Sequence, residues 1–133
     1  MMKSTKLING YTKILGVSIL TSMNSIQTFK YFNEKNVSSL VKKFSRAAKK
    51  NNLDGIICSP REIKYVRKEV GDDFIIITPG IRINNKIRND DQKRVATPKK
   101  AIDLGANYLV IGRPITESRN PLKVLKEINK TLH

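Results

Sequence analysis

Histidine and cysteine are almost absent from this chain. The only histidine, His133, is the last of the 133 residues, and Cys58 is the only cysteine. One terminal histidine excludes Ser-His-Asp and Cys-His catalysis, and it excludes an ordinary histidine-rich zinc site. A single cysteine cannot form an internal disulfide, so we expect a reducing compartment, the cytoplasm.

Acidic residues are also scarce, with 11 Asp and Glu against 26 Lys and Arg, which gives a net charge of +15. A charge of this size raises the question of a nucleic-acid partner. The basic residues are nevertheless scattered over nearly every segment, and no basic run of five or more occurs. We therefore expect the chain not to bind nucleic acid.

No apolar run is long enough to cross a bilayer. The run ILGVSIL at 14–20 follows several lysines, as in a short signal peptide, but its seven residues cannot span a membrane. No small-x-small cleavage site follows it. The pattern favours a buried strand over a signal peptide, and we expect no membrane association.

Short apolar runs alternate with amphipathic segments along the whole chain. The apolar runs are continuous, which is typical of strands covered on both faces, and they lie within 14–20, 54–60, 74–80 and 108–112. Helical spacing of apolar residues follows each run, at 37–48, 63–70, 98–104 and 121–128. Four strand–helix units predict an α/β fold with parallel strands, organised as one domain over residues 1–133.

Local signals mark where these helices begin and end. Ser59 and Glu62 predict a capping box around Pro60, and Thr97–Pro98 predicts a further helix start. Gly71 and Gly105 predict helix ends. In the last helix, the inward face is expected to hold Leu122, Val124, Leu125 and Ile128.

Anion donors follow two consecutive strands of the predicted sheet. Gly112 and Arg113 end the fourth strand, where a bare backbone and a guanidinium suit a phosphate or a carboxylate. Arg82 begins the only long loop, 81–96, which follows the third strand and is either a solvated loop or a functional one. Two such strand ends match the phosphate site after the last two strands of TIM barrels, so we expect an anion site here.

Five phrases of the sequence together resemble the orotidine 5'-phosphate decarboxylase family. In chain order they are LTSM (20–23), LDGIICSPREI (53–63), TPGIR (78–82), DDQKRVATP (90–98) and GANYLVIGRPIT (105–116). They cover nearly the whole chain but only the C-terminal half of the family's barrel, strands five to eight. The resemblance implies a partial TIM barrel, half of a (β/α)8 barrel, since a full barrel needs about 250 residues.

The family converts orotidine monophosphate to uridine monophosphate and carbon dioxide without metal or cofactor. The resemblance implies that Arg113 and the Gly112 backbone hold the 5'-phosphate and that Arg82 and Gln92 assist them. It also implies that Thr21 and Ser22 face the pyrimidine edge and that Pro79 packs near the base. The expected ligand is thus a nucleotide monophosphate, orotidine or uridine monophosphate.

The family's catalytic array is missing from the residues given. That array includes the phrase aspartate, any, lysine, any, any, aspartate, and only the lookalikes KEVGDD (68–73) and RNDDQK (88–93) occur here. Asp90 and Asp91 form a carboxylate pair that either reacts or, as we expect, fixes the loop. No catalytic residue is therefore assigned.

These observations predict half an enzyme, inactive alone. We expect it to pair with a second copy or with a separate N-terminal half, because half a barrel leaves an uncovered inner face. The alternative is a non-enzymatic remnant that binds phosphates or nucleic acid through its charge.

Overall fold

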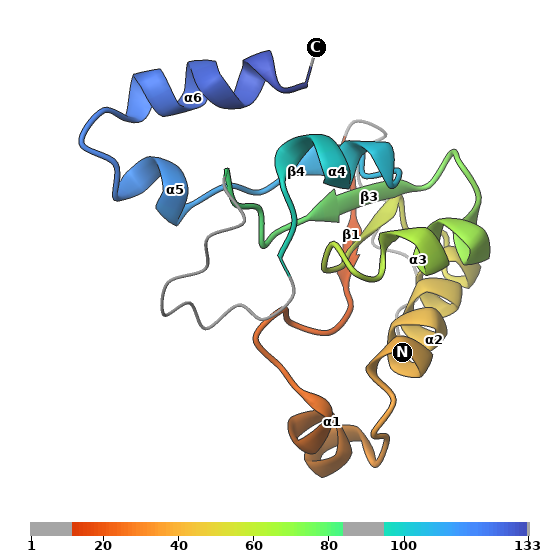
Figure 1. Ribbon diagram of the computed structural model, residues 1–133. Coiled ribbons are helices and arrows are strands. Elements are labelled where there is room, and N and C mark those ends of the chain that lie inside the picture. The colour runs from red at the N-terminus through yellow and green to blue at the C-terminus, as the bar shows by residue number, and fades with distance from the viewer. Residues whose placement is uncertain (1–11, 84–94, 133) are drawn as a thin grey trace.

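The chain folds around one parallel sheet. The computed structural model describes residues 12–83 and 95–132 (Figure 1). Its four strands are ordered as they occur in the chain: β1 (Leu15–Val17), β2 (Gly55–Ile57), β3 (Ile75–Thr78) and β4 (Tyr108–Leu109). All three neighbouring pairs are parallel, which confirms the α/β prediction of repeated strand–helix units.

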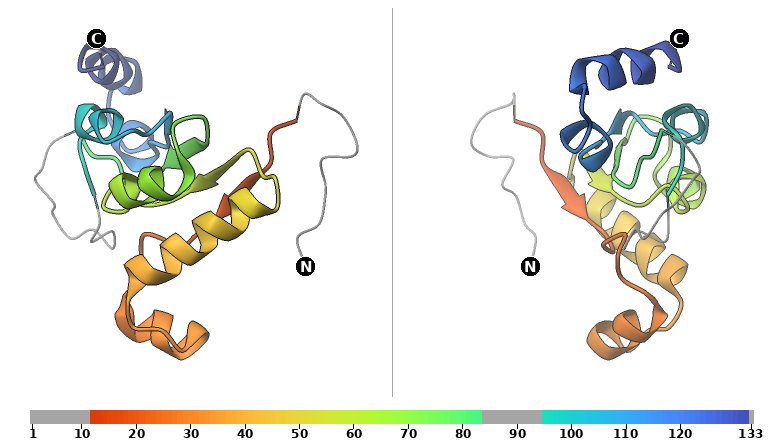
Figure 2. Two further views of the ribbon diagram at one scale, coloured as in Figure 1. Left: turned by 90° about the vertical axis from the view of Figure 1, so that its right-hand side faces the viewer. Right: turned by 60° about the vertical axis from the view of Figure 1, so that its left-hand side comes forward.

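Six helices lie among the described residues: α1 (Ser25–Phe32), α2 (Val37–Lys50), α3 (Ile63–Val70), α4 (Pro98–Asp103), α5 (Arg113–Thr116) and α6 (Pro121–Lys130). Helices α2, α3 and α4 pack against the strands, whereas α1 stands apart from the sheet (Figures 1 and 2). The last two helices pack on each other beyond the end of β4. None of the helices in the described ranges is long and apolar enough to cross a membrane.

Most of the predicted helix boundaries are confirmed. The Thr97 side chain accepts a hydrogen bond from the Lys100 amide, with Pro98 as the first helical residue of α4. Gly71 and Gly105 have φ angles of 78° and 105°, a region that side chains disfavour, so these glycines end α3 and the α4 turn.

The helix-covered face of the sheet holds the core. Ile56, Ile76 and Val66 are completely buried there. A Cβ placed on Gly16 would lie 3.5 Å from the Ala48 Cβ, so β1 and α2 are in close contact. This covered face is therefore packed as in an ordinary α/β domain.

The opposite face of the sheet is open. A row of paired residues crosses it, with Val17 beside Ile57, Ile57 beside Ile77 and Ile77 beside Tyr108. The two outer members, Val17 and Tyr108, are 59% and 60% exposed. The described helices cover one face only, which agrees with the expectation that half a barrel leaves its inner face uncovered. We call the row Val17–Ile57–Ile77–Tyr108 the inner row.

Arg67 ties together the amino edge of the sheet, where the strands begin. Its Nη1 donates to the carbonyls of Gly71 at 2.6 Å and Phe74 at 2.8 Å. Its Nη2 donates to the Gly105 carbonyl at 2.6 Å and to Asn107 Oδ1 at 2.9 Å. One guanidinium thus joins the turn before β3 to the turn before β4.

The structure corrects three expectations. Helices α1 and α5 were not predicted, and the strands are shorter than the apolar runs that contain them. In α6 only Ile128 is buried, while Leu122 is 62% exposed and Leu125 is also exposed. The inward face predicted for α6 is thus mostly uncovered, because α6 packs chiefly on α5 and not on the sheet.

Candidate functional site

The loop after β1 is held at both ends. At its start, the Ser18 Oγ and the Ser18 amide both donate to the Ile57 carbonyl, at 2.7 and 3.0 Å. At its end, Asn24 caps α1, and the Gln27 side chain accepts from the Asn24 amide at 2.9 Å. Between these anchors lie two predicted site residues, buried Thr21 and exposed Ser22. The capping box therefore fixes where this loop presents its hydroxyls.

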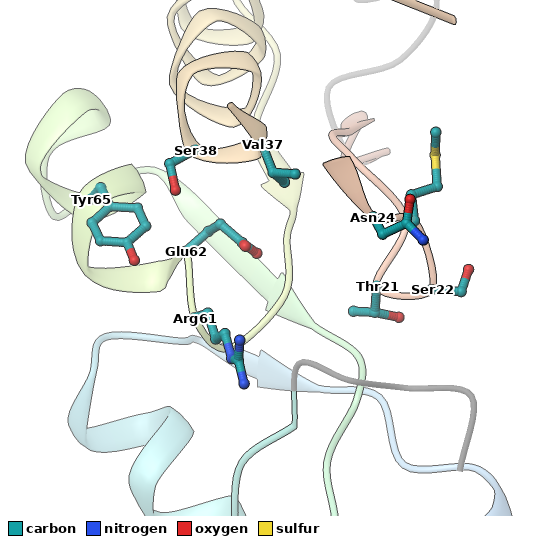
Figure 3. Close-up of a pocket in the computed structure, with 9 residues that line it drawn as sticks. Thr21, Ser22, Asn24, Val37, Ser38, Arg61, Glu62 and Tyr65 are labelled. Carbon is teal, nitrogen blue, oxygen red and sulfur yellow. The ribbon is translucent and has the colours of Figure 1, made fainter. Parts of the chain in front are cut away.

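Thr21 and Ser22 line a cavity of about 400 Å³ (Figure 3). Its walls come from three places: the β1–α1 loop, the first turn of α2 and the start of α3. The polar residues of the second and third walls are Ser38, Arg61, Glu62 and Tyr65. The sequence analysis did not predict three of these residues as part of a site: Ser38, Arg61 and Tyr65. Arg61 could have been found, since it follows the end of β2 by a few residues, and strand ends are where α/β folds bind ligands.

The expected capping box after β2 does not form. The Ser59 hydroxyl donates to Glu62 Oε2, and the Glu62 amide donates to the Ser59 carbonyl at 3.0 Å. Both residues are buried, and α3 begins later, at Ile63, without a side-chain cap. The predicted cap is wrong because Glu62, not Ser59, occupies the N-cap position of α3, and its carboxylate accepts the Ser59 hydroxyl instead of the Ser59 amide. The resulting turn holds Arg61 at the cavity.

The segment after β3 carries two predicted site residues, Pro79 and Arg82. Both are half-buried. The Arg82 amide donates to the Ala96 carbonyl at 2.9 Å, and Ile81 forms a parallel bridge with Ala96. These bonds hold the two ends of the long loop together, and they place Arg82 at the carboxyl edge of the sheet.

The segment after β4 carries Gly112 and Arg113. Arg113 is exposed and begins α5, whose first turn is closed by the Ile115 amide donating to the Gly112 carbonyl at 2.8 Å. Gly112 has a φ of −100°, which any residue can adopt. A Cβ placed on it would have no non-neighbouring atom within 4 Å. Packing inside the described part of the chain therefore does not require glycine here.

The predicted site residues share one edge of the sheet, and the cavity of Figure 3 holds only two of the described ones. All of the described ones follow the carboxyl end of a strand: Thr21, Ser22, Pro79, Arg82, Gly112 and Arg113. The cavity of Figure 3 contains the first two and none of the others. Strand β2 lies between the two groups, because Thr21 and Ser22 follow β1 whereas the other residues follow β3 and β4. Gln92 and the pair Asp90–Asp91 lie outside the described residues.

One lookalike of the catalytic phrase lies at the wrong edge. The KEVGDD segment forms the end of α3 and the turn that enters β3. Lys68, Asp72 and Asp73 are exposed at the amino ends of the strands. Residues 68–73 are thus on the opposite edge of the sheet from the predicted site, because they end α3 and lead into the start of β3.

Comparison with known proteins identifies the family to which this arrangement of strands and helices corresponds. Residues 1–128 match the model of the orotidine 5'-phosphate decarboxylase / HUMPS family. The chain is 49% identical over 120 residues to orotidine 5'-phosphate decarboxylase of Wolbachia pipientis, covering 90% of this chain and 52% of that relative. It is 40% identical over 136 residues to the enzyme of the same name from Haemophilus ducreyi, covering 99% of this chain and 59% of that relative.

Solved structures agree with the sequence comparison. The crystal structure of orotidine 5'-phosphate decarboxylase from Lactobacillus acidophilus superimposes with a TM-score of 0.75 at 32% identity, covering 97% of this chain and 53% of that one. The chain thus spans about half the length of the relatives it matches. Four parallel β-α units are the corresponding part of their barrel. The chain belongs to the orotidine 5'-phosphate decarboxylase / HUMPS family.

Proposed function

We propose that the chain is the nucleotide-binding half of an orotidine 5'-phosphate decarboxylase, corresponding to the C-terminal half of the barrel. The observation that carries the proposal is the pair of adjacent strand ends with anion donors, Arg82 after β3 and Gly112–Arg113 after β4. Family membership supplies the ligand, orotidine or uridine monophosphate.

The phosphate end of the site rests on Arg113. A guanidinium can hold two oxygens of a phosphate dianion, and the open space at Gly112 lets a ligand approach the backbone amide. Arg82 supports this grip from the neighbouring strand end, and Gln92 reaches the phosphate from the long loop. Thr21 and Ser22 face the pyrimidine edge, and Pro79 packs near the base.

Decarboxylation requires residues that we do not find in this chain. In the family an alternating lysine and aspartate array expels the carboxylate electrostatically and protonates the carbanion. The nearest described lookalike is at the amino edge of the sheet. The chain therefore binds nucleotide without turning it over until another segment supplies the array.

The open face of the sheet is where that segment fits. The inner row exposes apolar side chains, and both outer strands, β1 and β4, have an unpaired edge among the described residues. We expect either a second copy or the strands of an N-terminal half to cover this face in the working protein, which we place in the cytoplasm.

Calorimetry with uridine monophosphate tests the binding site. We expect Arg113→Ala to weaken binding between several-fold and about a hundredfold, because a hydrogen bond to a charged group contributes about 1.5–3 kcal/mol. Arg119→Ala is the matched control. Arg119 is also exposed, and this substitution removes the same charge from the turn between α5 and α6. Equal losses in both variants would favour diffuse electrostatics, and with it the nucleic-acid alternative.

An assay of carbon dioxide release tests whether this chain binds the nucleotide while another segment supplies the catalytic residues. The purified chain should show no turnover of orotidine monophosphate alone, and activity should appear when the N-terminal half of a relative is added. Turnover that persists in the chain alone, after host enzyme is removed, would contradict the proposal.

A further inference from the structure

The cavity of Figure 3 contains hydrogen-bond donors for which the described residues supply no acceptor. Arg61 is exposed and forms no hydrogen bond or ion pair within the described ranges. Asn36 caps α2 by accepting from the Ser39 amide. The amides of Val37 and Ser38, at the first two positions of this 14-residue helix, have no intrahelical acceptor. Both residues line the same cavity as Arg61.

The charges around this cavity favour an anion. The N-terminus of α2 carries a partial positive charge, and Arg61 adds a full one. Lys42 Nζ lies 5.8 Å from the centre of the Tyr65 ring, which lines the cavity, so a second cation is nearby. Glu62 is the only carboxylate among the described residues of the lining, and it already accepts the Ser59 hydroxyl.

The size and lining suit an organic molecule as well as a bare ion. A volume of about 400 Å³ falls within the range of small-molecule sites. The hydroxyls of Ser22, Ser38 and Tyr65 offer further hydrogen bonds, and the Tyr65 ring offers a flat apolar surface. In Figure 3 Ser38 and Tyr65 lie on one side and Thr21 and Ser22 on the other, and all four line the same cavity.

We propose that this cavity is a second anion-binding site, which takes the carboxylate or phosphate group of a small molecule between Arg61 and the first amides of α2. It is separate from the arginines that follow β3 and β4, because none of those residues lines it. A molecule bound here also contacts the loop of Thr21 and Ser22. The inference does not depend on the proposed function, since it rests on the cavity alone.

Amide chemical shifts of the full chain test this site. Inorganic phosphate and benzoate are titrated separately, so that the two anion types are distinguished. We expect the Val37 and Ser38 amides to shift on saturation with at least one of them. Arg61→Gln should weaken that binding about tenfold or more, as expected for the loss of a charged hydrogen bond.

Two control variants make the result specific. Lys64→Gln removes one positive charge from an exposed position of α3 outside the cavity, and it should change the affinity less than twofold. Arg113→Gln should leave the shifts of Val37 and Ser38 unchanged, even where it abolishes nucleotide binding. The proposal is overturned if neither anion shifts these amides, or if Arg61→Gln and Lys64→Gln weaken binding equally.

Discussion

The two faces of the sheet are built from the same strands, but one face is buried under helices and the other is exposed. On the covered face Ile56 and Ile76 are fully buried under α2, α3 and α4. On the open face the ends of the inner row, Val17 and Tyr108, remain more than half exposed. The apolar runs are continuous because both faces are suited to burial, yet the described residues cover only one of them.

This difference has an energetic consequence. Apolar surface left in water forgoes about 25 cal/mol per Å², so a few hundred Å² amount to several kcal/mol. The covered face stabilises the chain by itself, whereas the open face stabilises it only when something else packs there. Four experiments compare the two faces and the helix layer, in order of decreasing effect.

The largest difference is expected between Ile76→Ala and Ile77→Ala. The two changes remove the same atoms from adjacent residues of β3 that point to opposite faces. Ile76 is fully buried, so its loss should cost about 3–4 kcal/mol of unfolding free energy. Ile77 is half-buried, so Ile77→Ala should lower the unfolding free energy by only about 1 kcal/mol. Urea unfolding at high dilution measures both, and equal losses would show that the open face is already packed.

Tyr108→Lys tests whether the open face drives association. We expect the unmodified chain to be a dimer or larger in light scattering at micromolar concentration. A charge in the inner row should shift it toward monomer, because burying an unpaired ammonium is costly. Asn129→Lys adds the same charge on the exposed side of α6 and should have no effect. An unmodified chain that is a stable monomer, or a Tyr108→Lys variant that still associates, would contradict this role of the open face.

Thr78→Val tests the quality of the covered face. Thr78 is fully buried, and its Oγ1 has no hydrogen-bond partner among the residues that the structure describes. Replacing this hydroxyl by a methyl group should raise stability by about 1 kcal/mol, because an unpaired buried hydroxyl is unfavourable. Thr28→Val is the matched control: Thr28 is equally buried, but its Oγ1 donates to the Ser25 carbonyl at 3.1 Å. That variant should lose stability, and a loss in both would refute the explanation.

The smallest effect is a pH dependence in the helix layer. Arg46 donates two hydrogen bonds to Glu69, and this bonding is the main cause that lowers the pKa of Glu69 below its ordinary 4.5. The pair therefore adds stability above pH 4.5, and this contribution is lost as the pH falls through the lowered pKa. Glu69→Gln should remove that slope in acid unfolding curves. Glu127→Gln, on exposed α6, should leave it unchanged.

Local sequence signals predicted the elements that depend on local bonds. Thr97–Pro98 and Gly71 were predicted because caps and positive φ angles are encoded within a few residues. Helix α1 was missed although its capping box, Asn24 with Gln27, is a recognisable signal. The Ser59–Glu62 signal was misread because burial decides which group the carboxylate bonds, and burial depends on the rest of the fold.

Only the part of the candidate site that directly follows the ends of strands could be predicted from the sequence. Arg82 and Arg113 were placed at one edge because parallel strands put all their carboxyl ends together. The cavity around Arg61 was not predicted, since three separate segments form it and no spacing in the sequence records their meeting. For the same reason the exposed face of α6 was missed: its apolar spacing is correct, but the surface that would cover it is not supplied by the described residues.

The order of the strands bears on how such a chain is assembled. Each strand pairs with the next one along the chain, so no strand has to enter between two that are already joined. These parallel pairings still join residues that are distant in the sequence, such as Leu15 and Gly55, and non-local pairing of this kind forms slowly. Further strands can join at β1 or at β4 without opening an existing pair. A sheet with this topology can therefore be completed after it has formed, by addition alone.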